Sequence, residues 1–167
     1  MYYSTTYRSP VGILTLASDG EALAGLWISG QKYYGGSLSG KMTERDGLSV
    51  FTETKDWLDR YFAGEKPAIC ELELAPAGTA FQQTIWKLLC RIPYGQVTTY
   101  GALARQAAEV LGKPSMSGQA VGGAVGHNPI SIIIPCHRVI GADGSLTGYA
   151  GGIEKKHALL ELEHAKI

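Results

Sequence analysis

The side chains of Cys136, His137 and Arg138 place a thiol, an imidazole and a guanidinium next to one another in the chain. They end an almost wholly apolar run that starts at Ile130, and Pro135 directly precedes the thiol. Such a run is typical of a buried strand or core segment, and proline ends strand pairing because it has no N–H to donate. Two interpretations follow: a nucleophilic cysteine at the edge of the scaffold, or a buried structural cysteine.

A carboxylate near the end of the chain suits the imidazole. The last helix is predicted over residues 153–165, where Glu163 lies four residues after Leu159 and three after Leu160, on the apolar face. A buried carboxylate needs a partner. We therefore expect Glu163 to bind His137.

These groups predict a proton relay. Neighbouring side chains of a strand or helix point apart, so a water molecule would have to connect Cys136 with His137. Glu163 would orient His137, which would take the thiol proton through that water and leave Cys136 as the attacking thiolate. We interpret Arg138 as a structural partner.

Length and composition favour one folded domain, or one domain with a smaller companion. The chain has 167 residues, 45% hydrophobic and 18% charged, which allows a sizeable core. Its three cysteines show no paired spacing, which argues against a disulfide framework or a cysteine zinc site. No apolar stretch is long enough to span a bilayer, and the first residues lack a signal-peptide pattern. We expect a cytoplasmic protein with reduced thiols and no membrane partner.

The formal net charge of +0 hides an uneven distribution. Residues 1–78 carry seven Lys and Arg against ten Asp and Glu, whereas residues 79–140 carry five against one. Residues 141–167 carry three against four. The basic middle segment is compatible with a surface that faces phosphates, or simply with a solvated face.

The first part of the chain predicts a small antiparallel sheet with a helix. Strands are predicted, between good turn sequences, over residues 2–8, 12–17 and 22–28. Residues 29–47 show no periodicity and are expected to form a loop. Apolar residues recur at helical spacing from Val50 to Tyr61, and residues 69–74 alternate as a further strand.

A linker over residues 75–78 marks the expected domain boundary. Thr79 and Gln82 form a capping-box pattern that opens a helix. Two more helices are predicted over residues 100–110 and 117–126. The second part of the chain is therefore expected to be helical.

The helix predicted over residues 117–126 is unusual because Gly118, Gly122, Gly123 and Gly126 lie in or beside it. Each glycine inside a helix costs roughly 1 kcal/mol relative to alanine. Several together suit a backbone that something bulky approaches closely. One interpretation is the second helix of a helix-turn-helix in a DNA groove; the other is close helix packing inside the protein.

The sequence Ile-Pro-Cys-His-Arg-Val at 134–139 resembles the active-site signature of the O6-alkylguanine-DNA alkyltransferases, also called methylated-DNA-protein-cysteine methyltransferases. The resemblance extends to residues 120–124, to Asn128-Pro129, to the glycine-rich loop Gly148-Tyr149-x-Gly151-Gly152 and to the helix with Glu163. It covers residues 79–165 closely and residues 1–74 loosely.

The resemblance implies an α+β domain followed by a helical domain. An N-terminal α/β, ribonuclease-H-like domain with a small antiparallel sheet and a helix would cover residues 1–74. After the linker, residues 79–167 would form the DNA-binding alkyltransferase domain with a helix-turn-helix. The expected function is stoichiometric transfer of the alkyl group from O6-alkylguanine in double-stranded DNA to Cys136, after minor-groove binding and base flipping. The resemblance further implies a monomer that needs no cofactor and no metal.

The family pattern also implies roles for individual residues. Asn128 would hold the active-site loop, and Tyr100 would help to neutralise the departing guanine. The base pocket would use the carbonyl groups of Cys136 and Val139 and the N–H of Ala150, with further pocket residues at Tyr149 and Gly151. DNA contacts would come from Gly101, Lys113, Gln119, Ala120 and Gly123.

One position departs from the family pattern. Gln119 stands where the family commonly has an arginine finger, so the extrusion of the base would lack a charge. We expect Gln119→Arg to retain alkyl transfer. Two other functions remain open: a protein that binds alkylated bases without repairing them, against which the retained thiol argues, and a Cys-His hydrolase, which would turn over repeatedly.

Overall fold

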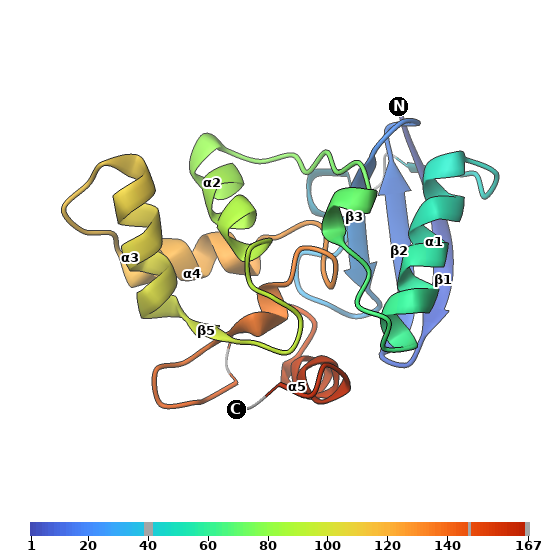
Figure 1. Ribbon diagram of the computed structural model, residues 1–167. Helices are drawn as coiled ribbons and strands as arrows, with labels where there is room; N and C mark the ends of the chain where they lie inside the picture. Colours follow the sequence, from blue (N-terminus) through green and yellow to red (C-terminus); the bar gives the residue numbers. More distant parts are fainter. Residues whose placement is uncertain (39–41, 147, 166–167) are drawn as a thin grey trace. The chain divides into compact units, whose positions relative to one another are not determined.

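The computed structural model describes residues 1–38, 42–146 and 148–165 (Figure 1). Residues 39–41 of the predicted loop and Thr147 before the glycine-rich loop lie outside the described residues. The chain divides into two compact units. The first contains residues 1–77 together with 129–131, and the second contains residues 78–128 and 132–167.

The first unit is built on a four-stranded sheet with the strand order β3-β2-β1-β4. An antiparallel meander is formed by β1 (Tyr2–Ser9), β2 (Gly12–Ser18) and β3 (Leu23–Ile28), which confirms the three strands expected from the alternating pattern. A short strand, β4 (Met42–Glu44), pairs in parallel with β1. The prediction of a loop over residues 29–47 is therefore wrong at β4 and at the 3-10 turn Gly36–Leu38, since neither is long enough to show a period.

The helix α1 (Ser49–Phe62) lies along this sheet (Figure 1). Its buried residues recur at the predicted helical spacing and are Val50, Phe51, Thr54, Trp57, Leu58 and Tyr61. The indole of Trp57 donates a hydrogen bond to the carbonyl of Ala68 at 2.8 Å. The strand predicted over residues 69–74 is wrong: Ile69–Glu71 is a 3-10 turn, and only Leu74 forms a bridge, with Leu23.

A short piece of chain from far along the sequence completes the first unit. Pro129–Ser131 runs parallel to β3, with Leu26 donating to the carbonyl of Pro129 at 2.8 Å and Ser131 donating to the carbonyl of Leu26 at 3.0 Å. The chain therefore leaves the second unit after Asn128 and returns to it at Ile132.

Three helices of the second unit pack against one another. They are α2 (Ala80–Leu89), α3 (Tyr100–Leu111) and α4 (Gly118–Gly126). Each N-terminus has a side-chain cap, from Thr79, Thr99 and Ser117 respectively, and such caps satisfy N–H groups that lack a partner in the helix. The capping box of Thr79 and Gln82 is confirmed.

The remaining elements of the second unit surround the reactive segment. Two parallel strands, β5 (Thr98–Thr99) and β6 (Val139–Ile140), pair with each other. The last helix, α5 (Ile153–Leu162), is shorter than predicted, because Glu163 is its C-cap and His164 takes a left-handed φ of 56°. Among the described residues, no helix combines the length and the apolar character needed to span a bilayer.

Candidate active site

The run from Ile130 to Val139 is buried throughout, but between the bridge at Ile130 and the first residue of β6 at Val139 it is not a strand. It forms a turn followed by the 3-10 helix η3 (Cys136–Arg138). Ile132 has a φ of 71°, which is a genuine outlier for a β-branched residue. The side-chain amide of Asn128 donates to the carbonyl of Ile134 at 2.8 Å. These features curl the chain, so that Cys136 is presented from a tight turn.

The Cys136 side chain is almost enclosed, with 6% of the residue exposed. Burial raises the pKa of its thiol, while a hydrogen bond from Asn128, the charge of Lys156 and nearby backbone N–H groups lower that pKa in part. The net direction is upward. Cys136 therefore rests as a thiol, and the thiolate has to form during the reaction.

His137 and Glu163 form a buried pair. The His137 Nε2 lies 2.7 Å from the Glu163 Oε2, and both side chains are fully buried. Burial lowers the pKa of His137. Burial also acts to raise the pKa of Glu163, but hydrogen bonds and charges from His137 and Arg138 outweigh it and bring the value to about 2.

These pKa shifts define the proton positions in the pair. With an ionised carboxylate and a neutral imidazole, Nε2 carries the proton and donates a hydrogen bond to Glu163, which leaves a lone pair on Nδ1. His137 Nδ1 is buried and has no hydrogen-bond partner among the described residues. The imidazole is thus held in the tautomer that can accept a proton.

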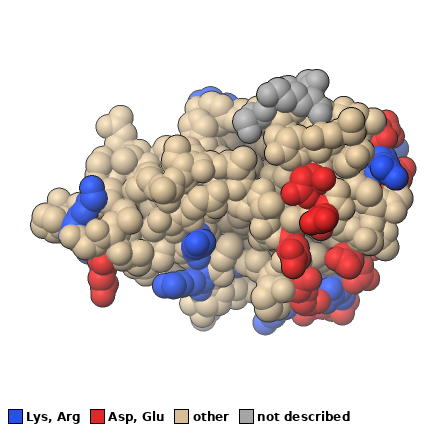
Figure 2. Space-filling model, turned by 90° about the horizontal axis from the view of Figure 1, so that it is seen from above, with Lys and Arg blue, Asp and Glu red and all other residues tan. Residues whose placement is uncertain are grey.

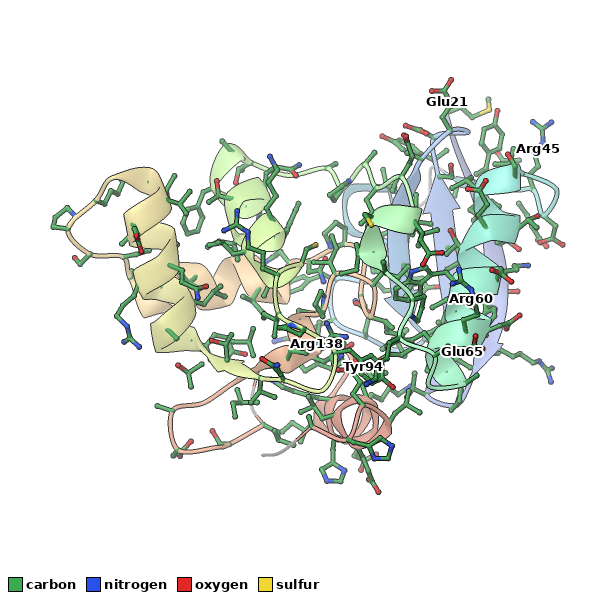
Figure 3. The ribbon with its side chains drawn as sticks, viewed as in Figure 1. Glu21, Arg45, Arg60, Glu65, Tyr94 and Arg138 are labelled. Atoms are coloured by element: carbon green, nitrogen blue, oxygen red, sulfur yellow. The ribbon has the colours of Figure 1, made fainter. Side chains whose placement is uncertain are left out.

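Arg138 supports the carboxylate. Its Nε lies 2.8 Å from Oε1 of Glu163, and one terminal nitrogen lies 3.0 Å from Oε2. The other terminal nitrogen donates to the carbonyl of Ile92 at 2.6 Å. The guanidinium also lies over the ring of Tyr94, with its central carbon 5.8 Å from the ring centroid (Figure 3). All of these contacts belong to a scaffold for Glu163.

The strand register brings Tyr100 into the same region. Thr98 pairs with Val139 and Thr99 with Ile140, and α3 begins at the next residue. Burial raises the pKa of the half-buried Tyr100, and the charge of Cys136 contributes in the same direction. Tyr100 therefore belongs to the electrostatic surroundings of the thiol.

Lys156 is the residue of this site that sequence reasoning missed. It is fully buried on α5, its ammonium donates to the carbonyl of Val139, and it lies 5.8 Å from the ring centroid of Tyr100. Burial lowers its pKa to about 8. A signal was present in the sequence, because Lys156 precedes Leu159 by three residues and Leu160 by four, on the stripe that carries Glu163.

The glycine-rich loop contacts Tyr100. A Cβ on Gly148 would lie 2.8 Å from the Tyr100 hydroxyl, and the φ of Gly148 is +83°. Tyr149 is buried, whereas Ala150 and Gly151 are half-buried. A glycine is required at 148 both for its backbone conformation and for the space beside Tyr100.

The residues predicted to contact DNA are exposed on α3, on α4 and on the turn between these two helices. On α4 they are Gln119, Ala120 and Gly123, while Val121, Ala124 and Val125 are buried. Gly101 and Lys113 are also exposed and line a groove of about 520 Å³ with residues of both helices. The Trp86 indole donates to the Ala124 carbonyl at 2.9 Å and so fixes the buried side of α4.

Nothing in the described residues resembles a metal centre, since no three His, Cys, Asp or Glu side chains gather in a way that could hold an ion. The charged side chains are unevenly distributed, as the sequence indicates. On the face seen in Figure 2, Asp and Glu gather over the first unit.

Comparison with known proteins identifies the family. One family model, described as the DNA binding domain of 6-O-methylguanine DNA methyltransferase, matches residues 80–165, and another, described as its ribonuclease-like domain, matches residues 1–76. The methylated-DNA–protein-cysteine methyltransferase of Haemophilus influenzae is 46% identical over 161 residues, which are 96% of this chain and 86% of that protein. Its Mycobacterium tuberculosis counterpart is 47% identical over 166 residues, which are 99% of this chain and 94% of that protein.

Solved structures agree with these sequence matches. The O6-methylguanine methyltransferase of Mycobacterium tuberculosis aligns with a TM-score of 0.84 at 48% identity, over 98% of this chain and 93% of that one. Mycobacterium tuberculosis OGT in complex with DNA aligns with a TM-score of 0.83 at 46% identity, over 98% and 92% of the two chains. With both family models matched and relatives aligned over nearly the whole length, this chain belongs to the 6-O-methylguanine DNA methyltransferase family.

Proposed function

We propose that this protein repairs O6-alkylguanine in double-stranded DNA by moving the alkyl group onto Cys136. Membership of the family makes it a DNA repair transferase that uses a protein cysteine as acceptor. We assign Cys136 as the acceptor, the residues that assist it, and O6-alkylguanine as the substrate base. The observation that carries it is the buried pair of His137 with Glu163: His137 lies on the same 3-10 helix as the thiol, Glu163 caps α5, and the imidazole Nδ1 has no hydrogen-bond partner among the described residues.

The reaction follows from the protonation states. The Cys136 thiol passes its proton through one water molecule to Nδ1 of His137, and Glu163 stabilises the imidazolium. The sulfur then attacks the alkyl carbon, so that the S–C bond forms while the C–O6 bond breaks. The electron pair of the broken bond stays on the guanine, which takes up the proton that the thiol released, so that His137 returns to its neutral form. Tyr100 assists by stabilising the charge on the departing base.

A base pocket can be assigned around this chemistry. We assign the carbonyl groups of Cys136 and Val139 as acceptors for the amino group of the guanine. The N–H of Ala150 would approach O6, and Tyr149 and Gly151 would shape the rest of the pocket. Asn128 would keep the active-site turn in place through its bond to the Ile134 carbonyl.

DNA binding is assigned to α3 and α4 as a helix-turn-helix that enters the minor groove. The exposed side of α4 consists of small or uncharged residues at 119, 120 and 123, which suits close approach to DNA without base reading. The O6 edge of guanine faces the major groove, so a protein bound in the minor groove has to flip the base out to bring its alkyl group to the sulfur. We propose that the protein acts as a monomer.

Single turnover is a consequence of the product. A thioether has no ready hydrolytic exit, so each molecule accepts one alkyl group. This separates the proposal from a Cys-His hydrolase, which would turn over, and from a protein that only binds lesions, which would remain unmodified.

The test is the intact mass of the protein after incubation with a duplex containing O6-methylguanine. We expect one stable methyl group, mapped to Cys136, and stoichiometric conversion of O6-methylguanine to guanine within the duplex. Cys136→Ala should still bind the duplex but gain no methyl group, whereas Cys90→Ala should gain one methyl group as the wild-type protein does. The proposal would be contradicted if the wild-type protein gained no methyl group, or if the DNA lost its methyl group and no methylated protein formed.

A further inference from the structure

The buried charge of Lys156 has no part in the reaction as proposed so far. Removing an ammonium from water is costly unless something compensates for it. Lys156 lies on the buried stripe of α5 with Leu159 and Leu160, where an apolar side chain would pack without this cost. The fold therefore retains a charge where packing alone does not require one.

The surroundings of Lys156 are defined by three elements. Its ammonium donates to Val139 on β6 and lies over the ring of Tyr100 on α3. From η3, both Cys136 and His137 interact with its charge. The carboxylate of Glu163 is already bound by His137 and Arg138. The anion that the reaction creates in these surroundings is the thiolate of Cys136.

We propose that Lys156 is a positioning residue whose ammonium, held by the Val139 carbonyl, stabilises the Cys136 thiolate while the thiol proton moves to His137. This inference rests on the function proposed above. No proton moves on Lys156 itself. Once the S–C bond has formed, the negative charge has left the sulfur with the guanine, and the ammonium remains.

The titration of both groups is consistent with this role. Burial raises the pKa of Cys136, and Lys156 acts against that rise. The Lys156 pKa of about 8 keeps its ammonium mostly charged at neutral pH. An opposite charge within about 4 to 6 Å lowers a pKa by about 1 to 3 units, so we expect loss of the Lys156 charge to raise the thiol pKa.

The test uses three variants of the full chain. Lys156→Met keeps the length and packing of the side chain without the charge, and it should fold at least as stably because it removes a buried charge. Lys156→Arg keeps the charge. Lys155→Gln removes a charge from the neighbouring, half-buried position as a matched control.

The first readout is the reaction of Cys136 with iodoacetamide across a pH series, followed by peptide mass spectrometry and without DNA. We expect Lys156→Met to shift the profile upward by at least one pH unit, so that the rate at neutral pH falls about tenfold or more. Lys156→Arg should recover most of the shift, and Lys155→Gln should match the unmodified protein. An unshifted Lys156→Met profile, or an equal fall in rate at every pH, would overturn the inference.

The second readout is single-turnover methyl transfer from DNA containing O6-methylguanine. We expect the same order of variants and a loss of about tenfold or more for Lys156→Met. If the wild-type protein accepted no methyl group, the proposed function would be wrong, and the iodoacetamide profiles would still test the effect of Lys156 on Cys136. If the unmodified protein accepted the group and Lys156→Met did so at the same rate, only the inference about Lys156 would fail.

Discussion

Glu163 is the residue on which the proposed proton relay depends. It accepts hydrogen bonds from His137 and from two nitrogens of Arg138, Nε and one terminal nitrogen, and its pKa of about 2 keeps it ionised at any working pH. An ionised acceptor at Nε2 fixes the imidazole tautomer. In the proposed mechanism, Glu163 therefore determines that Nδ1 keeps the lone pair which accepts the proton, without contacting the substrate itself.

We predict that Glu163→Gln slows methyl transfer about 10²-fold, the lower range for loss of general-base assistance. The amide cannot stabilise an imidazolium, and Arg138 is left with a buried charge. The free energy of unfolding should fall by about 3 kcal/mol, as when one member of a buried ion pair is removed. Single-turnover kinetics and urea unfolding measure both effects. Glu161→Gln, on the exposed side of α5, is the matched control, and equal rates in the two variants would refute the relay.

The same residues predict acid sensitivity of the fold. The pKa of His137 is lowered in the folded state, so below about pH 6.5 the unfolded chain binds a proton that the folded chain does not. Below about pH 4.5 the unfolded chain also protonates Glu163, which stays ionised in the fold down to about 2. Unfolded chains therefore bind more protons, and the free energy of unfolding should decrease steadily from pH 6.5 to 3. Urea unfolding at a series of pH values checks this, and Glu163→Gln should flatten the part of the curve below pH 4.5.

At the scale of elements, the site depends on turns more than on helices. The 3-10 turn that carries Cys136, the C-cap at Glu163 and the glycine at 148 each end or redirect a regular element. Short parallel pairing between β5 and β6 ties the first turn to the start of α3. Loops held by such a scaffold are a common location for catalytic groups.

We predict that Gly148→Ala impairs both stability and alkyl transfer, whereas Gly144→Ala impairs only stability. Both glycines have a φ near +85°, but a Cβ at 144 meets open space and one at 148 would lie 2.8 Å from the Tyr100 hydroxyl. The backbone conformation alone should cost about 1 to 2 kcal/mol in each variant. Thermal unfolding and single-turnover transfer separate the two effects. Equal transfer rates in the two variants would remove Tyr100 from the mechanism.

Regular elements with local signals could be predicted from the sequence, and elements without them could not. The meander, α1 and the Thr79 cap follow from alternation, helical spacing and capping residues. By contrast, β4 exists only because β1 offers an unpaired edge, and the turn at Ile132 opposes the preference of an isoleucine. Both are determined by tertiary structure.

The site was predictable to a similar extent. The pairing of Glu163 with His137 follows from an acid on an apolar stripe. Lys156 lies on the same stripe and is buried. Because lysine side chains are rarely buried, its sequence position alone predicts a surface residue. The tautomer of His137 and the resting thiol of Cys136 depend on burial, which only the folded structure supplies.

At the scale of the whole molecule, charge is divided between the two halves of the chain. Residues 1–78 are net acidic and residues 79–140 net basic. DNA affinity should therefore depend on salt through a small number of phosphate contacts from the second unit.

We predict that Lys113→Gln weakens DNA binding about equally for all sequences and reduces the slope of log K against log salt concentration by about 1. Lys113 is exposed and lines the groove shared by α3 and α4. Fluorescence anisotropy at several salt concentrations measures the slope. Lys55→Gln on α1 of the first unit should leave the slope unchanged; a loss of the same size there would mean that DNA is held elsewhere.

The path of Pro129–Ser131 has a consequence for engineering this chain. Because these residues run beside β3, a single cut after Ala77 does not yield two independent halves: the larger fragment still carries a short segment that packs with the smaller one. A chimera that exchanges residues 1–77 between relatives would also exchange β3, which pairs with Ile130, six residues before Cys136. An exchange of halves should therefore preserve the pairing of Leu26 with Pro129–Ser131. Without that pairing, the segment that leads to Cys136 would lose its attachment to the sheet.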